Sequence, residues 1–241
     1  MREPHDRRSS EHSGHVRAVL LDFYGTVVAE DDAIVADIYR QVLDQCTDPR
    51  EVSATQVGSY RWRAFREEMA ADGAAFRCQR DIAVSSLART VRRFGSAADP
   101  EALCASQFAF WREPDLFPDA RAFLELIDVP VCVVSNIDRA DVLAAIAYHG
   151  LPLAHVVTSE DVGRYKPHPA MFEAALDLLG LPVGAVLHIG DSLSADILGA
   201  HTLGIPSVWV NRSGKPRPDP LHAITEVDTL AAALPLVPHR R

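Results

Sequence analysis

The second half of the chain alternates apolar runs with stretches of helical spacing. The segments HGLP at 149–152, LGLP at 179–182 and LGIP at 203–206 each follow a helix-like stretch and approach an apolar run. Glycine accepts the left-handed conformation that ends a helix, and a proline soon after it prevents the helix from resuming. Together with an apolar run near the N-terminus, the pattern predicts five strands, at residues 16–21, 131–134, 155–158, 185–189 and 207–210.

These predicted strands are almost continuous in valine, leucine and isoleucine. Strands that are buried on both faces have this composition, and helices of roughly 10–15 residues between them imply parallel crossovers. The pattern therefore predicts the α/β class, with a doubly wound, parallel, Rossmann-like sheet. In such sheets ligands bind beyond the carboxyl ends of the strands. Asp22, Ser135 and Asp191 stand at such ends.

Residues 30–113 break this alternation, because they lack a strand-like run and place apolar residues at helical spacing. Ile34, Ile38 and Val42 form one stripe, and the aromatic Trp62 belongs to another. Such stripes usually face a core, so we interpret both as core positions. We expect an inserted helical-bundle cap. The predicted domains are a disordered leader at 1–15, a core domain at 16–29 and 114–241, and a cap domain at 30–113.

Composition excludes several classes of function. The net charge of −9 opposes binding to a nucleic acid backbone, and no run approaches the roughly 20 apolar residues of a membrane span. The first 15 residues are polar and contain no apolar signal segment, which predicts disorder rather than secretion. The 4 cysteines are widely separated, as is typical of reduced thiols. We therefore expect a cytoplasmic protein with no nucleic acid partner and no membrane attachment.

An aspartate, Asp22, ends the first predicted strand, where an uncompensated charge is costly. A helix-capping or turn aspartate would account for this residue alone. However, Gly25 and Thr26 follow closely, and the turn they form can aim backbone N–H groups and a hydroxyl at an anion. The second strand ends in Ser135 and Asn136, neutral groups that suit an anionic oxygen. The pattern indicates an anion-binding site at the strand ends.

Asp191 ends the fourth predicted strand, and Asp196 lies five residues further along the chain. Asp22 and Asp191 on neighbouring strands would repel each other unless a cation lay between them. Mg²⁺ is the natural candidate, since it prefers oxygen ligands and commonly uses one or two carboxylates plus a substrate phosphate. Asp196 has three interpretations: it orients water, holds the loop, or lies on a helix surface.

Lysine is scarce in this chain and occurs only as Lys166 and Lys215. Lys166 precedes Pro167, which favours an extended conformation and keeps the lysine out of the following helix. A lysine in a chain that otherwise uses arginine indicates a need for a compact point charge. A solvated surface lysine is the alternative interpretation.

Four motifs occur in order along the chain: DFYGT at 22–26, SN at 135–136, KPHP at 166–169 and GDSLSAD at 190–196. With these motifs the chain resembles the haloacid dehalogenase superfamily from Val16 onward, and its helical insertion resembles the superfamily's cap, which closes over the site. The resemblance implies that Asp22 is a nucleophile that forms an aspartyl intermediate.

The resemblance also implies roles for the remaining motif residues. Carboxylates and the backbone carbonyl of Tyr24 would hold Mg²⁺, while Ser135 and Lys166 would neutralise charge on the transferring group. The implied metal ligands are Asp22, Tyr24, Asp191 and Asp196. The implied substrate-binding residues are Gly25, Thr26, Ser135, Asn136 and Lys166.

Tyr24 departs from the pattern of most phosphatases in this superfamily, which place an aspartate there as general acid and base. A phenol has a pKa of about 10 and donates a proton less readily than a carboxylic acid. The superfamily's dehalogenases carry Asp-x-Tyr-Gly-Thr, but their fourth motif generally lacks the Gly-Asp pair and binds no metal. Phosphonate-cleaving relatives use a cap lysine, and residues 30–113 contain none.

The retained Asp191 and Asp196 favour phosphate chemistry, because a metal site is superfluous for carbon–halogen displacement. The sequence thus predicts a Mg²⁺-dependent phosphatase that acts on a small phosphorylated metabolite. Its leaving group is intrinsically good, or is protonated by Tyr24, by a cap residue or by solvent. The alternatives are a metal-independent 2-haloacid dehalogenase and a catalytically silent binding protein. Five cap arginines are either anion clamps or ordinary surface residues: Arg61, Arg63, Arg66, Arg77 and Arg80.

Overall fold

The computed structural model describes residues 16–48, 52–70, 75–217 and 224–240, and the predicted leader at 1–15 lies outside them. Its centre is a 6-stranded sheet in the order β3-β2-β1-β4-β5-β6, with each strand parallel to its neighbours. The fold is therefore the predicted doubly wound α/β class. The strands are β1 (Ala18–Leu21), β2 (Val131–Ser135), β3 (His155–Thr158), β4 (Val186–Gly190), β5 (Ser207–Val210) and β6 (Thr225–Val227).

All five predicted strands are present, with small shifts at their ends. β1 begins at Ala18 rather than at residue 16, and β2 continues to Ser135. The sixth strand, β6, was not predicted. It consists of Thr-Glu-Val at the edge of the sheet, and two of its three residues are exposed. A polar edge strand this short has no apolar run from which it could be predicted.

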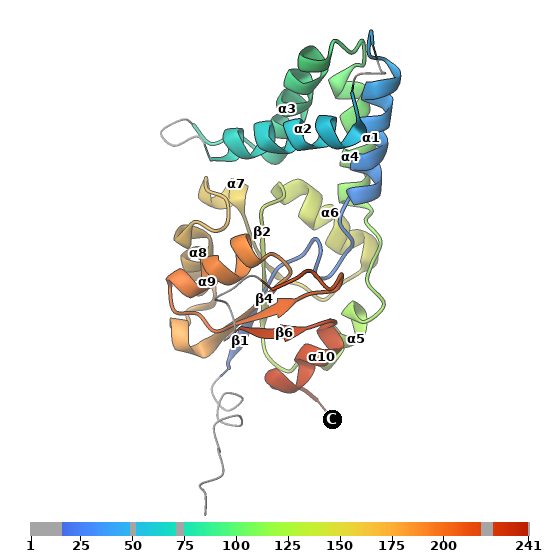
Figure 1. Cartoon of the computed structure of the whole chain (residues 1–241). Coiled ribbons are helices and arrows are strands. Elements are labelled where there is room, and N and C mark those ends of the chain that lie inside the picture. The colour runs from blue at the N-terminus through green and yellow to red at the C-terminus, as the bar shows by residue number, and fades with distance from the viewer. Residues whose placement is uncertain (1–15, 49–51, 71–74, 218–223, 241) are drawn as a thin grey trace, which may run out of the picture.

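Two layers of helices cover the sheet (Figure 1). Ala18 and Leu20 of β1 pack with α8 and α9, whereas Val19 and Leu21 point to the opposite face and pack with α5, α6 and α10. This alternation is the two-residue period of a strand buried on both sides. The helices are α5 (Ala120–Leu126), α6 (Arg139–His149), α7 (Ser159–Val162), α8 (Pro169–Leu179), α9 (Leu198–Thr202) and α10 (Leu230–Ala233).

The glycine-proline joints end helices as the sequence predicts. Gly150 and Gly180 follow α6 and α8 in the left-handed conformation, with φ of 58° and 62°. At the third joint, Gly204 has φ of 73° after α9. Each left-handed glycine lets the chain leave its helix and turn back toward the sheet.

Of the five helices described between β1 and β2, the first four form a group of their own beyond one end of the sheet (Figure 1). Two linkers join this group to the sheet and pair with each other, through Ala29 N–H to the Asp115 carbonyl at 2.8 Å and Phe117 N–H to the Val27 carbonyl at 3.1 Å. We call this group the cap; its predicted limits at 30 and 113 stay a prediction. The helices are α1 (Asp32–Asp44), α2 (Ala54–Met69), α3 (Gln79–Phe94) and α4 (Pro100–Arg112).

The predicted cap stripes are core positions, with one exception. Ile38 and Val42 are fully buried in α1. Trp62 on α2 is 59% exposed, so its interpretation as a core residue was wrong. Its ring stacks on Phe65 at a centroid distance of 5.9 Å instead of entering the bundle. Among the described residues, no helix is long and apolar enough to cross a bilayer.

Candidate active site

Lys166 joins the carboxyl ends of three neighbouring strands. Its ammonium group donates to Asp22 Oδ1 at 2.6 Å, to Asp196 Oδ1 at 2.7 Å and to the Val134 carbonyl at 2.7 Å. The side chain is therefore fully hydrogen-bonded, and the residue is only 5% exposed. These contacts rule out the solvated surface lysine. The two acids raise the pKa of Lys166 above its usual range although burial opposes them, so the residue stays charged.

Asp22 is held in place at the end of β1, between β2 and β4. Its backbone N–H donates to the Ile189 carbonyl at 2.9 Å, and the Thr26 hydroxyl donates to Oδ2 at 2.9 Å. Gly25 has φ of +88°, and a Cβ atom there would lie 2.7 Å from the Asp191 carboxyl carbon. Only glycine therefore lets Asp191 approach the turn at residues 22–26 this closely.

Three carboxylates lie close together here, and two of them, Asp22 and Asp196, pair with Lys166. Asp22, Asp191 and Asp196 each offer one oxygen atom, and these atoms all lie within 4.8 Å of one another. Burial, followed by the charges of Asp22 and Asp196, raises the pKa of Asp191 to about 7. The exposed Lys215 ammonium lies 3.6 Å from Asp191 and offsets this effect only in part. The cluster therefore carries more negative charge than its own cations balance.

Asp196 is the most completely engaged of the three acids. It is 1% exposed, and it accepts hydrogen bonds from Lys166 and from the Ser192 N–H at 3.0 Å. His188 Nε2 lies 3.1 Å from the same carboxylate. Although burial opposes them, Lys166 and His188 hold the pKa of Asp196 below its usual range. The helix-surface interpretation of Asp196 was therefore wrong, and its partners favour a role in holding the loop.

The donors that remain available suit a magnesium ion. Asp22 and Asp191 supply carboxylate oxygens, and no described residue donates a hydrogen bond to the backbone carbonyl of Tyr24. An all-oxygen set with an excess of negative charge is what Mg²⁺ prefers, and the ion would keep several waters. The residues present thus fit the ion that the sequence implies.

Hydrogen-bond donors for an anion are also available at the turn formed by residues 22–26. The backbone N–H groups of Phe23 and Tyr24 have no acceptor among the described residues. The Ser135 hydroxyl accepts from the Ile137 N–H at 3.2 Å, which leaves its own proton free to donate. A tetrahedral anion bound beside Asp22 would meet these donors and the Lys166 ammonium.

Residues 16–204 match a family model described as haloacid dehalogenase-like hydrolase. The chain belongs to this family. The predicted family is thus confirmed, and the α/β sheet with flanking helices and a helical cap agrees with it.

Relatives of this hydrolase include both phosphatases and dehalogenases. A "Haloacid dehalogenase-like hydrolase domain-containing protein 3" from Danio rerio is 38% identical over 42% of this chain and 44% of its own length. A phosphoserine phosphatase from Thermus thermophilus is 28% identical over 69% of this chain and 60% of its own length. The chain thus spans about half the length of these curated relatives. An L-2-haloacid dehalogenase structure from Xanthobacter autotrophicus has a TM-score of 0.70 at 20% identity, covering 92% of this chain and 98% of that one.

Two residues of this hydrolase that were predicted to contact substrate are engaged with protein groups instead. The Gly25 N–H donates to the Val28 carbonyl at 2.7 Å, and the Thr26 hydroxyl is bonded to Asp22. Both residues therefore stabilise the conformation of the turn at residues 22–26. The free donors at this turn belong to Phe23 and Tyr24. Sequence motifs do not single out these two residues, because every residue type except proline carries a backbone N–H.

Asn136 is likewise engaged with protein groups. Its side-chain oxygen accepts from the Lys166 N–H at 2.7 Å, and its amide nitrogen donates to the Lys166 carbonyl at 3.4 Å. The predicted contact between Asn136 and substrate stays a prediction. Its observed partners favour a positioning role, in which one loop of the site fixes the other.

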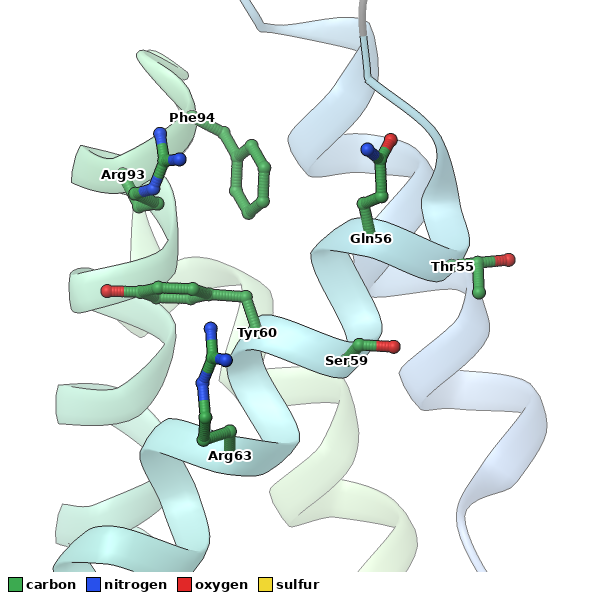
Figure 2. Close-up of a pocket in the computed structure, with 7 residues that line it drawn as sticks. All are labelled: Thr55, Gln56, Ser59, Tyr60, Arg63, Arg93 and Phe94. Carbon is green, nitrogen blue, oxygen red and sulfur yellow. The ribbon is translucent and has the colours of Figure 1, made fainter.

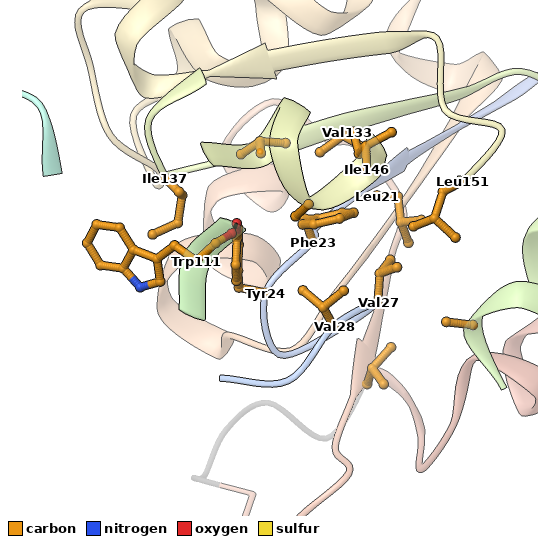
Figure 3. Close-up of a cluster of buried hydrophobic side chains, with 14 of the residues drawn as sticks. Leu21, Phe23, Tyr24, Val27, Val28, Trp111, Val133, Ile137, Ile146 and Leu151 are labelled. Carbon is orange, nitrogen blue, oxygen red and sulfur yellow. Dashed lines mark hydrogen bonds between the residues drawn. The ribbon is translucent and has the colours of Figure 1, made fainter. Parts of the chain in front are cut away.

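Tyr24 points into the apolar core rather than serving as a free acid. Its hydroxyl donates to the Trp111 carbonyl, and its ring meets that of Phe23 edge to face at 5.3 Å (Figure 3). Burial, followed by the charge of Asp141, raises the pKa of Tyr24. A hydroxyl that is already donated, with a raised pKa, is a poor general acid. The hydrogen bond of the tyrosine instead connects the turn at residues 22–26 to the end of α4.

The cap arginines are mostly paired with cap or core groups. Arg61 is 4% exposed and donates to Gln107 at 2.9 Å, so it is not an ordinary surface residue. Arg77 and Arg80 form ion pairs with Glu68 and Asp141. Arg63 borders a hollow of about 310 Å³ that lies between α2 and the end of α3 and contains none of the motif residues (Figure 2). The hollow is therefore separate from the strand-end site.

Sequence analysis missed three residues that support the acids. His188 is buried beside Asp196, Trp209 Nε1 donates to the Asp191 carbonyl at 2.7 Å, and Lys215 approaches the Asp191 carboxylate. Only Lys215 could have been singled out from the sequence, because it is the second of the chain's two lysines. The other two lie inside strands, where an aromatic or a histidine is ordinary.

Proposed function

We propose that the protein is a Mg²⁺-dependent phosphatase that acts on a small phosphorylated metabolite through an aspartyl-phosphate intermediate. One observation carries this proposal: Asp22, Asp191 and Asp196 offer oxygens within 4.8 Å of one another, and the buried Lys166 pairs with only two of them, Asp22 and Asp196. Buried carboxylates at this spacing repel each other strongly unless a further cation joins them.

The charge of the cluster distinguishes phosphate from halide chemistry. A phosphate dianion approaching Asp22 meets a like charge, and the excess negative charge would slow the attack unless it were screened. Displacement of halide from carbon places no such dianion beside the nucleophile, so Asp191 would only hinder it. The relative named phosphoserine phosphatase supports the same substrate class.

In the proposed first half of the reaction, each site residue has a separate role. When bound, Mg²⁺ would screen the charge between the nucleophile and the phosphate, held by Asp22, Asp191 and the Tyr24 carbonyl. A carboxylate oxygen of Asp22 attacks phosphorus, and the bond from phosphorus to the leaving oxygen breaks. Ser135 donates to a phosphoryl oxygen, and the positive charge of the Lys166 ammonium stabilises the negative charge that rises on the phosphoryl group.

The second half of the reaction regenerates the aspartate. Water attacks the phosphorus of the aspartyl phosphate, the bond between phosphorus and the Asp22 oxygen breaks, and inorganic phosphate leaves. The proton for the first leaving group comes from solvent, or is not needed, because the Tyr24 hydroxyl is donated to Trp111. The proposal therefore includes a preference for substrates with good leaving groups.

A second candidate function is metal-independent 2-haloacid dehalogenation. One observation favours it, the buried Tyr24 in place of the usual second acid. A halide leaves without a proton, so this enzyme would need Asp22 and Lys166 but neither Asp191 nor Mg²⁺.

A cytoplasmic site of action is part of the proposal. The 4 cysteines are all free thiols in the structure, and 3 of them are buried. Free thiols are usual in the reducing cytoplasm and support this location. The expected partner is the phosphorylated metabolite itself, with no nucleic acid and no membrane involved.

The test is a panel of phosphorylated metabolites and 2-haloacids, assayed with and without EDTA. We expect phosphate release that EDTA abolishes and Mg²⁺ restores. D191N should lose this activity, while D177N, which removes an exposed acid on α8, should retain it. Chloride release from 2-chloropropionate that persists in EDTA and in D191N would support the dehalogenase instead. Absence of both activities would support a catalytically silent protein.

A further inference from the structure

The N-terminus of the cap helix α3 is capped by the core domain rather than by its own residues. Asp138, in the loop between β2 and α6, accepts hydrogen bonds from the N–H groups of Gln79 at 2.7 Å and Arg80 at 3.0 Å. The residue at the N-cap position, Cys78, makes no side-chain capping bond. A carboxylate is well suited to these free N–H groups and to the positive end of the helix dipole.

A second contact between cap and core lies beside the first. Arg80 donates two hydrogen bonds to the carboxylate of Asp141 in α6, from Nε at 2.7 Å and from Nη2 at 2.6 Å. Asp141 is fully buried, and the Arg80 guanidinium also lies 4.4 Å from the centre of the Phe108 ring. Paired hydrogen bonds of this kind are strong and fix the orientation of both groups. These bonds therefore fix the position and orientation of the first turn of α3 relative to the loop after β2 and to α6.

A third contact reaches the neighbour of the catalytic lysine. The Tyr165 hydroxyl donates to the Arg77 carbonyl at 2.6 Å, and its ring packs on Phe76 at 5.3 Å. Tyr165 directly precedes Lys166 in the chain. One short cap segment, residues 76–80, thus contacts both of the core loops that carry the proposed phosphate-binding residues.

The two core loops are also joined to each other. Asn136 binds the backbone of Lys166 through both ends of its side-chain amide, and Lys166 in turn contacts Asp22. Asp138 lies two residues beyond Asn136 in the same loop. A continuous series of hydrogen bonds and short chain segments therefore leads from the start of α3 to the nucleophile.

We propose that Asp138 is a positioning residue. It couples docking of the cap to the arrangement of the two core loops that carry Ser135 and Lys166. With α3 docked, Asp138 is held by two N–H groups, and the loop at 135–138 holds Asn136 against Lys166. With α3 undocked, the 5% exposed carboxylate loses both partners, and the loop loses its support. The site would thus be fully assembled only beneath a docked cap. This inference rests on the proposed function for its effect on catalysis, but not for its effect on the loop.

The test compares D138A with D99A by hydrogen exchange and by kinetics. Asp99 caps α4 within the cap, through the Glu101 N–H at 3.0 Å, so D99A removes a helix cap that does not cross to the core. We expect D138A to speed exchange of the Gln79, Arg80 and Lys166 amides by about tenfold or more. The Lys166 amide is the decisive probe, because it lies in the core and bonds to Asn136, not to Asp138. D99A should leave all three amides unchanged.

Kinetics on the best phosphorylated substrate give the second measurement. We expect D138A to lower kcat/KM by about tenfold or more, with kcat reduced, and D99A to change it less than about twofold. D138N retains one acceptor oxygen, so it should rescue part of the loss, and it serves as the test variant if D138A does not fold.

The inference is overturned if the Lys166 amide and kcat/KM are both unchanged in these variants. It is also overturned if only the α3 amides lose protection, since Asp138 would then be a helix cap with no link to the site. If Lys166 loses protection while the wild-type protein hydrolyses nothing, the coupling stands and the proposed function fails.

Discussion

The turn that follows β1 has two sides of opposite character. On one side Asp22 joins Lys166, Asp191 and Asp196 in a buried charged cluster at the strand ends. On the other side Tyr24 and its apolar neighbours enter the hydrophobic core that continues into the cap (Figure 3). The proposed phosphatase chemistry rests on the charged side, whereas the apolar side carries the tyrosine of the dehalogenase-like motif.

The contrast shows that a single motif does not decide the chemistry. Tyr24 is engaged by Trp111 and takes no part in the charged cluster, so its presence is compatible with phosphate chemistry. The acids on the charged side, by contrast, repel one another, and in the proposed function a bound cation offsets that repulsion. The four predictions below test the two sides separately.

The largest effect on the rate of hydrolysis is expected from a change at Asp22, the proposed nucleophile on the charged side. D22N removes the attacking oxygen, so we expect hydrolysis of any substrate to fall by roughly 10⁴-fold or more. The exposed D177N is the control and should keep wild-type rates. Residual activity within tenfold of wild type would show that Asp22 does not form the intermediate.

The next effect concerns the leaving group, because the apolar side offers no acid. We expect p-nitrophenyl phosphate to exceed glycerol 3-phosphate in kcat/KM by about 10²–10⁴-fold, the usual contribution of general acid catalysis. Steady-state phosphate release measures both rates. Equal values would indicate an acid elsewhere in the site.

The tyrosine itself is expected to contribute stability rather than catalysis. Y24F leaves the buried Trp111 carbonyl without its donor, which should cost about 1–3 kcal/mol of unfolding free energy in urea. The rate with p-nitrophenyl phosphate should change by less than about twofold. Y148F, on an exposed side chain, should alter neither quantity. A large loss of rate with unchanged stability would make Tyr24 part of the chemistry.

The smallest effect is a pH dependence of metal binding. Asp191 has a pKa raised to about 7 in the metal-free protein, chiefly by burial and then by Asp22 and Asp196. Below that pH Mg²⁺ must displace a proton, and above it the carboxylate is already charged, so affinity rises with pH. We expect about tenfold tighter binding at pH 8 than at pH 6 by calorimetry. Affinity independent of pH would contradict this account of Asp191.

The sequence predicts the parts of this molecule that depend on local patterns. Apolar runs and glycine-proline joints determine β1 to β5 and the helices that connect them, and the motifs place Asp22, Ser135 and Asp191 at strand ends. These features need only a few neighbouring residues, together with the rule that parallel strands present their carboxyl ends on one edge.

The remaining features depend on contacts between distant residues. Asp138 caps α3 although it lies 59 positions from Gln79, and no periodicity links the two residues. The engagement of Thr26 with Asp22 and the exposure of Trp62 likewise follow from how the elements pack. Residue type predicts that a hydroxyl or a carboxylate will find a partner, but the fold selects which partner it is.

Calorimetric titration of Mg²⁺ into the metal-free protein at pH 8 tests the central claim most directly. Wild type and D177N should bind one ion per chain, and D191N should show no saturable binding in the same range. Binding that is absent from wild type, or equal in D191N, would contradict a cation site shared by the acids of β1 and β4.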